Sequence, residues 1–143
     1  MIVDASVLLC AFFPDESQIQ AQSLVREHVA GRVLLKAPSL LPYELSNAIW
    51  QAERRGRVTH SQADEILKAM IGLEIETISQ PMAAMLPLAR RFNCSAYDAA
   101  YLALAEVRQE PFITADERLF AAVHADLDWV IWLGDYPVDG QPE

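Results

Sequence analysis

The sequence has few cysteines and no long apolar run, and each shortage narrows the kind of protein it can encode. Its 143 residues include only Cys10 and Cys94, with no CxxC pair. This excludes a disulfide scaffold or a zinc finger and is typical of a reducing cytosol. The longest apolar run covers residues 7–13, far short of the ~20 residues that cross a bilayer. The N-terminus, Met1–Asp4, lacks the basic region of a signal peptide. We therefore expect a cytoplasmic protein.

Basic residues are scarce as well. The chain has 11 Lys and Arg against 20 Asp and Glu, a net charge of −9. Because phosphate binding depends on Lys and Arg, a general electrostatic grip on nucleic acid is disfavoured. The excess acid could serve solubility alone or could in part converge on a cation, and composition does not separate the two. Five arginines fall into two clusters, which could contact phosphate or be solvated helix ends, the commoner fate: Arg54, Arg55 and Arg57, and Arg90 and Arg91.

What is present is a well-patterned globular chain. Hydrophobic residues make up 52% of it, which argues against intrinsic disorder. The length fits one domain, which we expect over residues 1–133, followed by a loose tail rich in Gly, Pro and Asp over 134–143. The patterns predict strands at 1–3, 32–36, 74–78, 112–114 and 129–133, and helices at 5–13, 18–30, 42–55, 60–71, 82–92, 96–108 and 117–124. Ser17 is the predicted cap of the helix at 18–30, and Thr59 with Gln62 forms a capping-box pattern.

Strands therefore alternate with helices, and the strands are short and apolar without alternation. This pattern predicts an α/β fold, a three-layer α/β/α sandwich with a mainly parallel central sheet of four or five strands. In such sheets ligands bind at the carboxyl ends of the strands. That rule points to Asp4, just after the first strand, and to Asp116, just after the strand at 112–114.

Two further acids occupy related positions. Glu44 falls in the first turn of the helix after the second strand, and Asp98 in the first turn of the helix opened by Ser95. A parallel sheet can bring all four acids to one edge. Clustered carboxylates raise one another's pKa, and a hard divalent cation such as Mg²⁺ or Mn²⁺ relieves that repulsion. Such a site suits phosphodiester hydrolysis.

Each acid also has a purely structural explanation. Ser95 with Asp98, and Thr114 with Glu117, fit capping boxes, and the helix dipole favours acids in any first turn. Taken singly, Asp98 and Glu44 are better explained as helix-terminal residues than as metal ligands. Asp4 is harder to explain in this way, although it could cap the helix that follows it.

Four segments together resemble a known family. They are Ile2–Ser6, Glu44–Ala48, Ser95–Glu106 and Thr114–Leu119, and in this order and spacing they resemble the PIN domain. More narrowly, they resemble the toxin nucleases of VapBC-type toxin–antitoxin pairs. The stretches Tyr97–Leu102 and Thr114–Asp116 are the most specific, and the resemblance spans the whole chain.

The resemblance implies an endoribonuclease that depends on Mg²⁺ or Mn²⁺. By position, Asp4, Glu44 and Asp98 would bind the metal, with Asp116 as the fourth acid. Ser6 and Thr114 match the small hydroxyl residues beside the acids, and Asn47 lies one turn after Glu44. A metal-activated water would attack the phosphorus, leaving 5′-phosphate and 3′-hydroxyl ends. Because the chain is acidic, RNA would need residues of the two arginine clusters, or a groove between the two copies of a dimer, to be held.

The resemblance also implies partners, namely RNA, a small antitoxin that covers the acidic pocket with a helix or tail, and a second copy in a homodimer. Leu40, Leu41 and Trp50 could be contact residues of such a dimer, although we expect them in the core. Three alternatives remain. A phosphatase is disfavoured because Ser6 stands where it needs a second Asp, and a receiver domain because it needs a lysine after a late strand, whereas the only lysines are Lys36 and Lys68. A housekeeping RNA-processing nuclease and a non-catalytic binding module of the same fold stay open.

Overall fold

Five short strands form a single sheet at the centre of the molecule. The computed structural model describes residues 1–138. Within them the strand order is β3-β2-β1-β4-β5, and every pairing is parallel. The strands are β1 (Ile2–Val3), β2 (Lys36–Pro38), β3 (Glu76–Ile78), β4 (Phe112–Thr114) and β5 (Val130–Trp132). The predicted α/β fold with a parallel sheet is confirmed.

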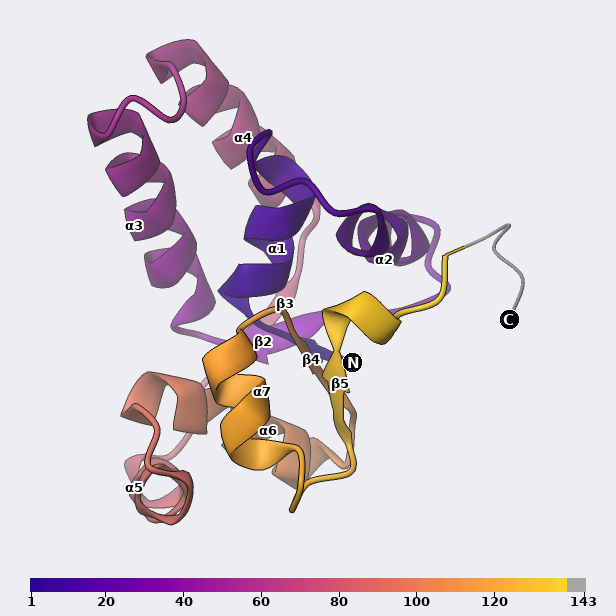
Figure 1. Cartoon of the computed structure of the whole chain (residues 1–143), viewed down its shortest axis with the longest axis vertical. Helices are drawn as coiled ribbons and strands as arrows, with labels where there is room; N and C mark the ends of the chain where they lie inside the picture. Colours follow the sequence, from indigo (N-terminus) through magenta and orange to yellow (C-terminus); the bar gives the residue numbers. More distant parts are fainter. Residues whose placement is uncertain (139–143) are drawn as a thin grey trace.

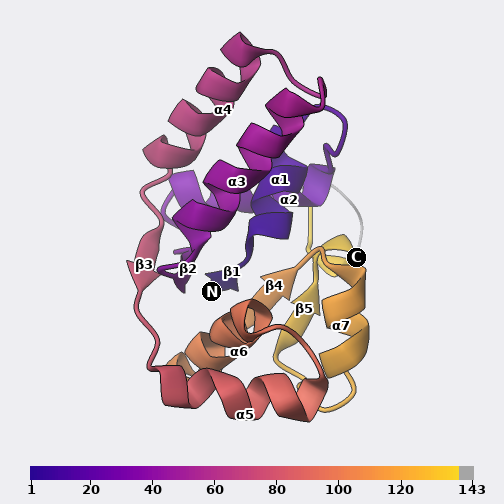
Figure 2. The same cartoon turned by 90° about the vertical axis from the view of Figure 1, so that its left-hand side faces the viewer.

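Helices cover both faces of this sheet (Figure 1). On one side lie α1 (Ala5–Phe12), α2 (Ile19–Val29), α3 (Leu41–Arg54) and α4 (His60–Gly72). On the other lie α5 (Met82–Phe92), α6 (Ala96–Arg108) and α7 (Glu117–Val123), as a perpendicular view also shows (Figure 2). The three layers match the prediction. In the described part of the chain, no helix combines the length and the apolar character needed to span a bilayer.

The core lies where α6 packs on the two central strands. All residues from Ala99 to Ala105 are buried, so this helix is enclosed on every side, by the sheet and by α5. Four alanines in that stretch allow close approach of its neighbours. The residues Ile2, Val3, Phe112 and Ile113 are fully buried, which explains why β1 and β4 show no polar alternation.

Several predicted helix ends are confirmed. Thr59 and Gln62 make both hydrogen bonds of a capping box at the start of α4. Ser95 caps α6 by accepting a hydrogen bond from the Asp98 amide at 3.0 Å. Gly56 follows α3 with a φ of 73°, a left-handed conformation that glycine adopts without strain.

Two predictions in the first third of the chain are wrong. The strand expected at 32–36 begins only at Lys36, because the amides of Arg32 and Val33 both donate to the Glu27 carbonyl and prolong the end of α2. Leu34 is 62% exposed, unlike a buried strand residue. Ser17 does not cap α2, whose N-cap is Gln18; the Ser17 hydroxyl instead accepts a hydrogen bond from the Gln22 side chain.

The chain reverses its direction of travel across the sheet between β1 and β4. From β1 it proceeds to β2 and β3, then crosses back under the sheet through α5 and α6 to add β4 on the other side of β1. The carboxyl ends of β1 and β4 therefore border the crevice in which α/β proteins place ligands. After β5 a short 3₁₀ helix covers Leu133–Asp135, and the remainder of the tail, residues 139–143, lies outside the described residues.

Candidate active site

Asp4 lies at the carboxyl end of β1, at the centre of this crevice. It is only 7% exposed and is the N-cap of α1. Its Oδ1 accepts hydrogen bonds from the Ser6 hydroxyl at 2.5 Å and from the Val7 amide at 3.3 Å. Its Oδ2 accepts from the Thr114 hydroxyl at 2.5 Å. Among residues 1–138 no cation forms an ion pair with Asp4, so its charge is held by neutral donors alone.

Ser6 and Thr114 connect the two strand ends through this carboxylate. Each hydroxyl donates to Asp4 and accepts a backbone amide, from Ala115 at 2.9 Å and from Asp116 at 3.0 Å respectively. Thr114 is completely buried. The capping box predicted for Thr114 and Glu117 is therefore wrong, because α7 is capped by Asp116, whose Oδ1 accepts from the Leu119 amide at 3.0 Å.

Burial makes the ionised form of Asp4 costly. Burial, with a smaller contribution from the nearby charge of Asp116, raises the pKa of Asp4 to about 7 against the lowering effect of its three hydrogen bonds. A carboxylate that is buried without a cation gains strongly from binding one. Asp4 is thus prepared for a positive ligand by its surroundings.

Glu44 is held by a tyrosine from the opposite layer of the fold. It is half-buried in the first turn of α3, and its Oε1 accepts a hydrogen bond from the Tyr101 hydroxyl at 2.5 Å. Tyr101 belongs to α6, is 2% exposed and stacks on Phe112. Burial and the charge of Asp98 raise the pKa of Glu44. The sequence reasoning assigned no role to Tyr101, because an aromatic residue in an apolar helix is normally explained by packing.

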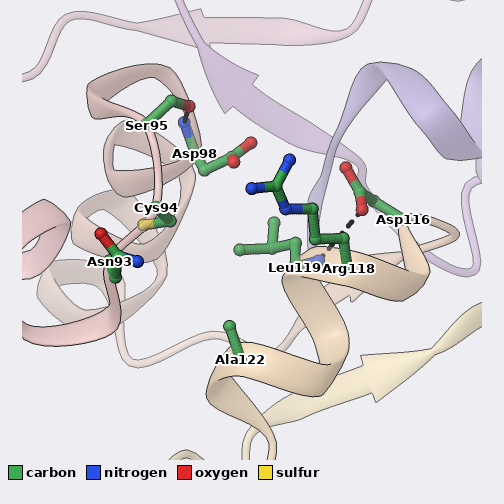
Figure 3. A pocket seen from close by; sticks show the side chains of 8 residues that line it. All are labelled: Asn93, Cys94, Ser95, Asp98, Asp116, Arg118, Leu119 and Ala122. Carbon is green, nitrogen blue, oxygen red and sulfur yellow. Dashed lines mark hydrogen bonds between the residues drawn. The ribbon is translucent and has the colours of Figure 1, made fainter.

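Asp98 and Asp116 face the same pocket (Figure 3). This pocket has a volume of about 310 Å³ and lies between the start of α6 and the start of α7. Its lining consists of Asn93, Cys94, Ser95, Asp98, Asp116, Arg118, Leu119 and Ala122. Burial and the charge of Asp116 raise the pKa of Asp98. Cys94 has its pKa raised by burial and by Asp98, which keeps the thiol protonated.

The four acids are linked by mutual repulsion. Asp116 acts on both Asp4 and Asp98, and Asp98 acts on Glu44. The fold has therefore brought side chains from four separate segments into one electrostatic group. As they stand, however, no three His, Cys, Asp or Glu side chains within residues 1–138 converge closely enough to hold a metal ion.

The remaining candidates lie in more varied places. Asn47 is exposed on α3, and its side chain makes no hydrogen bond within the described chain. Arg54 and Arg55 lie at the far end of α3 from Glu44, about 15 Å along the helix axis. Arg57 is bound to Asp15 and Glu16. Arg90 and Arg91 form the last turn of α5, which leads directly into the pocket lining at Asn93.

One basic residue at the pocket was missed entirely. Arg118 lies in the first turn of α7, and its guanidinium extends between Asp98 and Asp116 (Figure 3). Its charge lowers the pKa of Asp98. In the sequence Arg118 is an isolated basic residue in a helix, so no local pattern distinguishes it.

Comparison with known proteins agrees with this geometry. Residues 1–125 match the PIN domain family. The chain belongs to that family. The resemblance predicted from four short segments is confirmed by a match that spans all four.

Curated PIN relatives cover nearly the same length. Ribonuclease VapC3 of Pyrobaculum aerophilum is 28% identical over 123 residues, which are 83% of this chain and 91% of the relative. Ribonuclease VapC1 of Mycobacterium tuberculosis is 30% identical over 123 residues, 85% of this chain and 89% of the relative. Among solved structures, PAE2754 of Pyrobaculum aerophilum superimposes with a TM-score of 0.69 at 26% identity, covering 93% of this chain and 90% of the other.

Proposed function

We propose that this PIN domain is an endoribonuclease that depends on Mg²⁺ or Mn²⁺. The observation that carries the proposal is Asp4, buried at the switch point of the sheet and fixed by two hydroxyls without a cation partner. The names of the two relatives, both ribonucleases, support RNA as the substrate. The fold alone would be compatible with many activities.

The donor set fits a hard divalent ion. Carboxylate oxygens are the ligands that Mg²⁺ and Mn²⁺ prefer, and a dication would relieve the repulsion that links the four acids. Asp4, Glu44 and Asp98 would hold the ion, with Asp116 as the fourth acid. When bound, such an ion activates water and neutralises charge on the phosphate.

The chain's own residues would hold the carboxylates in position and take the proton from the attacking water. Ser6 and Thr114 keep Asp4 in one orientation, and Tyr101 does the same for Glu44. One of the four carboxylates would take the proton from the attacking water. The Cys94 thiol is not suited to act as a covalent nucleophile, because its raised pKa keeps it protonated.

A cleavage assay with matched carboxyl-to-amide variants tests the proposal. Purified protein should cleave single-stranded RNA in Mn²⁺ and stop when the ion is chelated. Asp98→Asn should lower the rate by about a thousandfold or more, because it removes a charge that the reaction requires. Glu110→Gln, the same chemical change at the opposite end of the sheet, should cleave normally. Equal cleavage by wild type and Asp98→Asn would contradict the proposal, as would cleavage that survives chelation.

We extend the proposal to a toxin role, in which an antitoxin inhibits the enzyme in the cytoplasm and the toxin forms a homodimer.

An apolar surface on α3 and α4 could receive such a partner. Trp50, predicted for the core, is instead 53% exposed on α3. With Leu67 and Ile71 it lines adjoining apolar hollows between α3 and α4 that begin beside the turn carrying Glu44. This surface is suited to an amphipathic helix of a partner.

Expression in a bacterial host separates the toxin role from its rivals. Expression of a toxin should arrest growth, and Asp98→Asn should relieve the arrest. Harmless expression of an active nuclease would favour the housekeeping alternative. A protein that binds no divalent ion by calorimetry would instead favour the non-catalytic binding module.

A further inference from the structure

Arg118 differs from other arginines of this chain in what surrounds its charge. Arg57 and Arg32 are satisfied by carboxylates at hydrogen-bonding distance. Arg118 is exposed and extends over the pocket, yet within residues 1–138 it forms no ion pair with Asp98, Asp116 or any other acid. Its donors are therefore available to a ligand, although it lies between the carboxylates of Asp98 and Asp116 (Figure 3).

The pocket supplies the rest of a phosphate-binding environment. Its walls carry polar groups from Asn93 and Ser95, and its volume of about 310 Å³ accommodates part of a nucleotide. The whole chain carries a net charge of −9 and repels RNA at a distance. A positive side chain beside the four acids, as Arg118 is, would offset that repulsion at the point where a phosphate must approach. The planar guanidinium matches two phosphate oxygens at once, which a lysine cannot do.

We propose that Arg118 binds a phosphate of the RNA strand in this pocket, beside the acidic residues. The inference rests on the proposed nuclease function and adds a binding residue that neither cluster of arginines supplied. Because Arg118 lies on α7, two residues after Asp116, the phosphate would lie near the carboxyl end of β4, where Thr114 is located.

A phosphate-binding role predicts opposite changes in the affinities for Mn²⁺ and RNA, whereas a purely structural role predicts a change in stability and none in RNA affinity. Removal of a positive charge next to Asp98 and Asp116 should strengthen the binding of Mn²⁺ while it weakens the binding of RNA. An arginine that merely neutralised the acids for stability would lower the melting temperature on removal and leave RNA affinity unchanged. The two roles are therefore separable in one set of variants.

The test uses the full chain with Arg118→Gln, Arg118→Lys and the control Arg108→Gln, which removes an exposed arginine from the far end of α6. Binding of a fluorescein-labelled single-stranded RNA is followed by anisotropy in Ca²⁺, and Mn²⁺ binding by calorimetry. We expect Arg118→Gln to weaken RNA binding about tenfold and to reduce its salt dependence by about one phosphate contact. Mn²⁺ affinity should rise a few-fold, Arg118→Lys should recover part of the RNA affinity, and KM should rise more than kcat falls.

Unchanged RNA affinity and salt dependence in Arg118→Gln would overturn the inference, and so would an equal loss in Arg108→Gln. If the wild type cleaves RNA while Arg118→Gln behaves identically, the inference alone fails. If the wild type neither binds nor cleaves RNA in Mn²⁺, the proposed function fails and the inference falls with it. Because Arg118 is exposed, all three variants should keep the wild-type melting temperature, which circular dichroism verifies.

Discussion

The two ends of the central sheet treat a carboxylate in opposite ways. At the amino end, Glu110 precedes β4 and its Oε1 accepts from Lys36 at 2.8 Å and from the Met1 ammonium at 3.4 Å. Although burial opposes it, these cations hold the pKa of Glu110 below its usual value. At the carboxyl end, Asp4 has only neutral donors, and burial raises its pKa to about 7. Both acids are attached to the same central pair of strands.

This comparison distinguishes an acid that the chain itself pairs with cations from an acid for which we propose an external cation. Glu110 receives two cations from the chain, both at Oε1, while its Oε2 is buried and makes no hydrogen bond within the described residues. Asp4 and its three companions form no ion pair within residues 1–138, and the nearest cation at the pocket is the Arg118 guanidinium, which extends between Asp98 and Asp116 (Figure 3) and lowers the pKa of Asp98. Under the proposed function, the place where acids lack ion-pair partners, more than the number of acids, marks the end of the sheet that would bind the ion.

The largest expected consequence is an inverted pH dependence at Asp4. The folded pKa of about 7 lies above the unfolded value of 3.8, so folding favours the protonated form. In chelator, the free energy of unfolding should therefore fall as pH rises from about 4 to about 7, by up to about 4 kcal/mol from this group. Urea denaturation at several pH values measures the effect.

Two controls sharpen this prediction. Asp4→Asn cannot ionise and should show a flatter pH profile in the same range. Mn²⁺ should restore the stability of the wild type near pH 7.5 but not that of the variant. Matching pH profiles for wild type and Asp4→Asn would mean that folding does not raise the pKa of Asp4.

Tyr101→Phe should produce an intermediate effect. It removes the hydroxyl that orients Glu44 but keeps the ring that stacks on Phe112. Loss of such a supporting hydrogen bond typically costs 10- to 100-fold in metal affinity or activity, and we expect about tenfold in each. Calorimetry with Mn²⁺ and the cleavage assay measure both, with Tyr43→Phe, an exposed neighbour of Glu44, as the matched control. Identical behaviour of the two variants would remove Tyr101 from the site.

Glu110→Gln should have the smallest effect and the opposite pH dependence. Because the folded pKa of Glu110 is lowered, its stabilising contribution is present above the unfolded value of 4.5 and is lost as pH falls through the folded one. Partial exposure limits this contribution to about 1 kcal/mol or less. Urea denaturation at pH 7 and pH 3 tests it. A change in Mn²⁺ binding or cleavage in this variant would erase the distinction between the two ends.

The sequence predicts those elements whose signals are local. The cap at Ser95, the capping box at Thr59 and the parallel sheet all follow from neighbouring residues or short apolar runs, and all are confirmed. The run Val33–Leu35 has the composition of a strand, yet backbone hydrogen bonds to Glu27 decide its conformation. Those bonds depend on how α2 ends, which composition does not reveal.

The residues of the candidate site divide in the same way, into those with a local sequence signal and those without one. Its acids were found because each stands beside a predicted strand end or helix start. The surroundings of Tyr101 and Arg118 arise from tertiary proximity: Tyr101 binds a glutamate 57 positions away, and Arg118 lies beside Asp98 of α6 (Figure 3). Conversely, Asn47 has the right helical spacing from Glu44, but it lies exposed on the outer layer. Spacing within one helix does not predict what the opposite layer contributes.

The donors around Asp4 also limit how it can ligate. Each carboxylate oxygen has two lone pairs. On Oδ1 both are taken, by the Ser6 hydroxyl and the Val7 amide, whereas on Oδ2 the Thr114 hydroxyl takes only one. Within the described residues Asp4 therefore keeps one lone pair without a hydrogen bond, on Oδ2, and this is the atom with which it would hold the proposed ion.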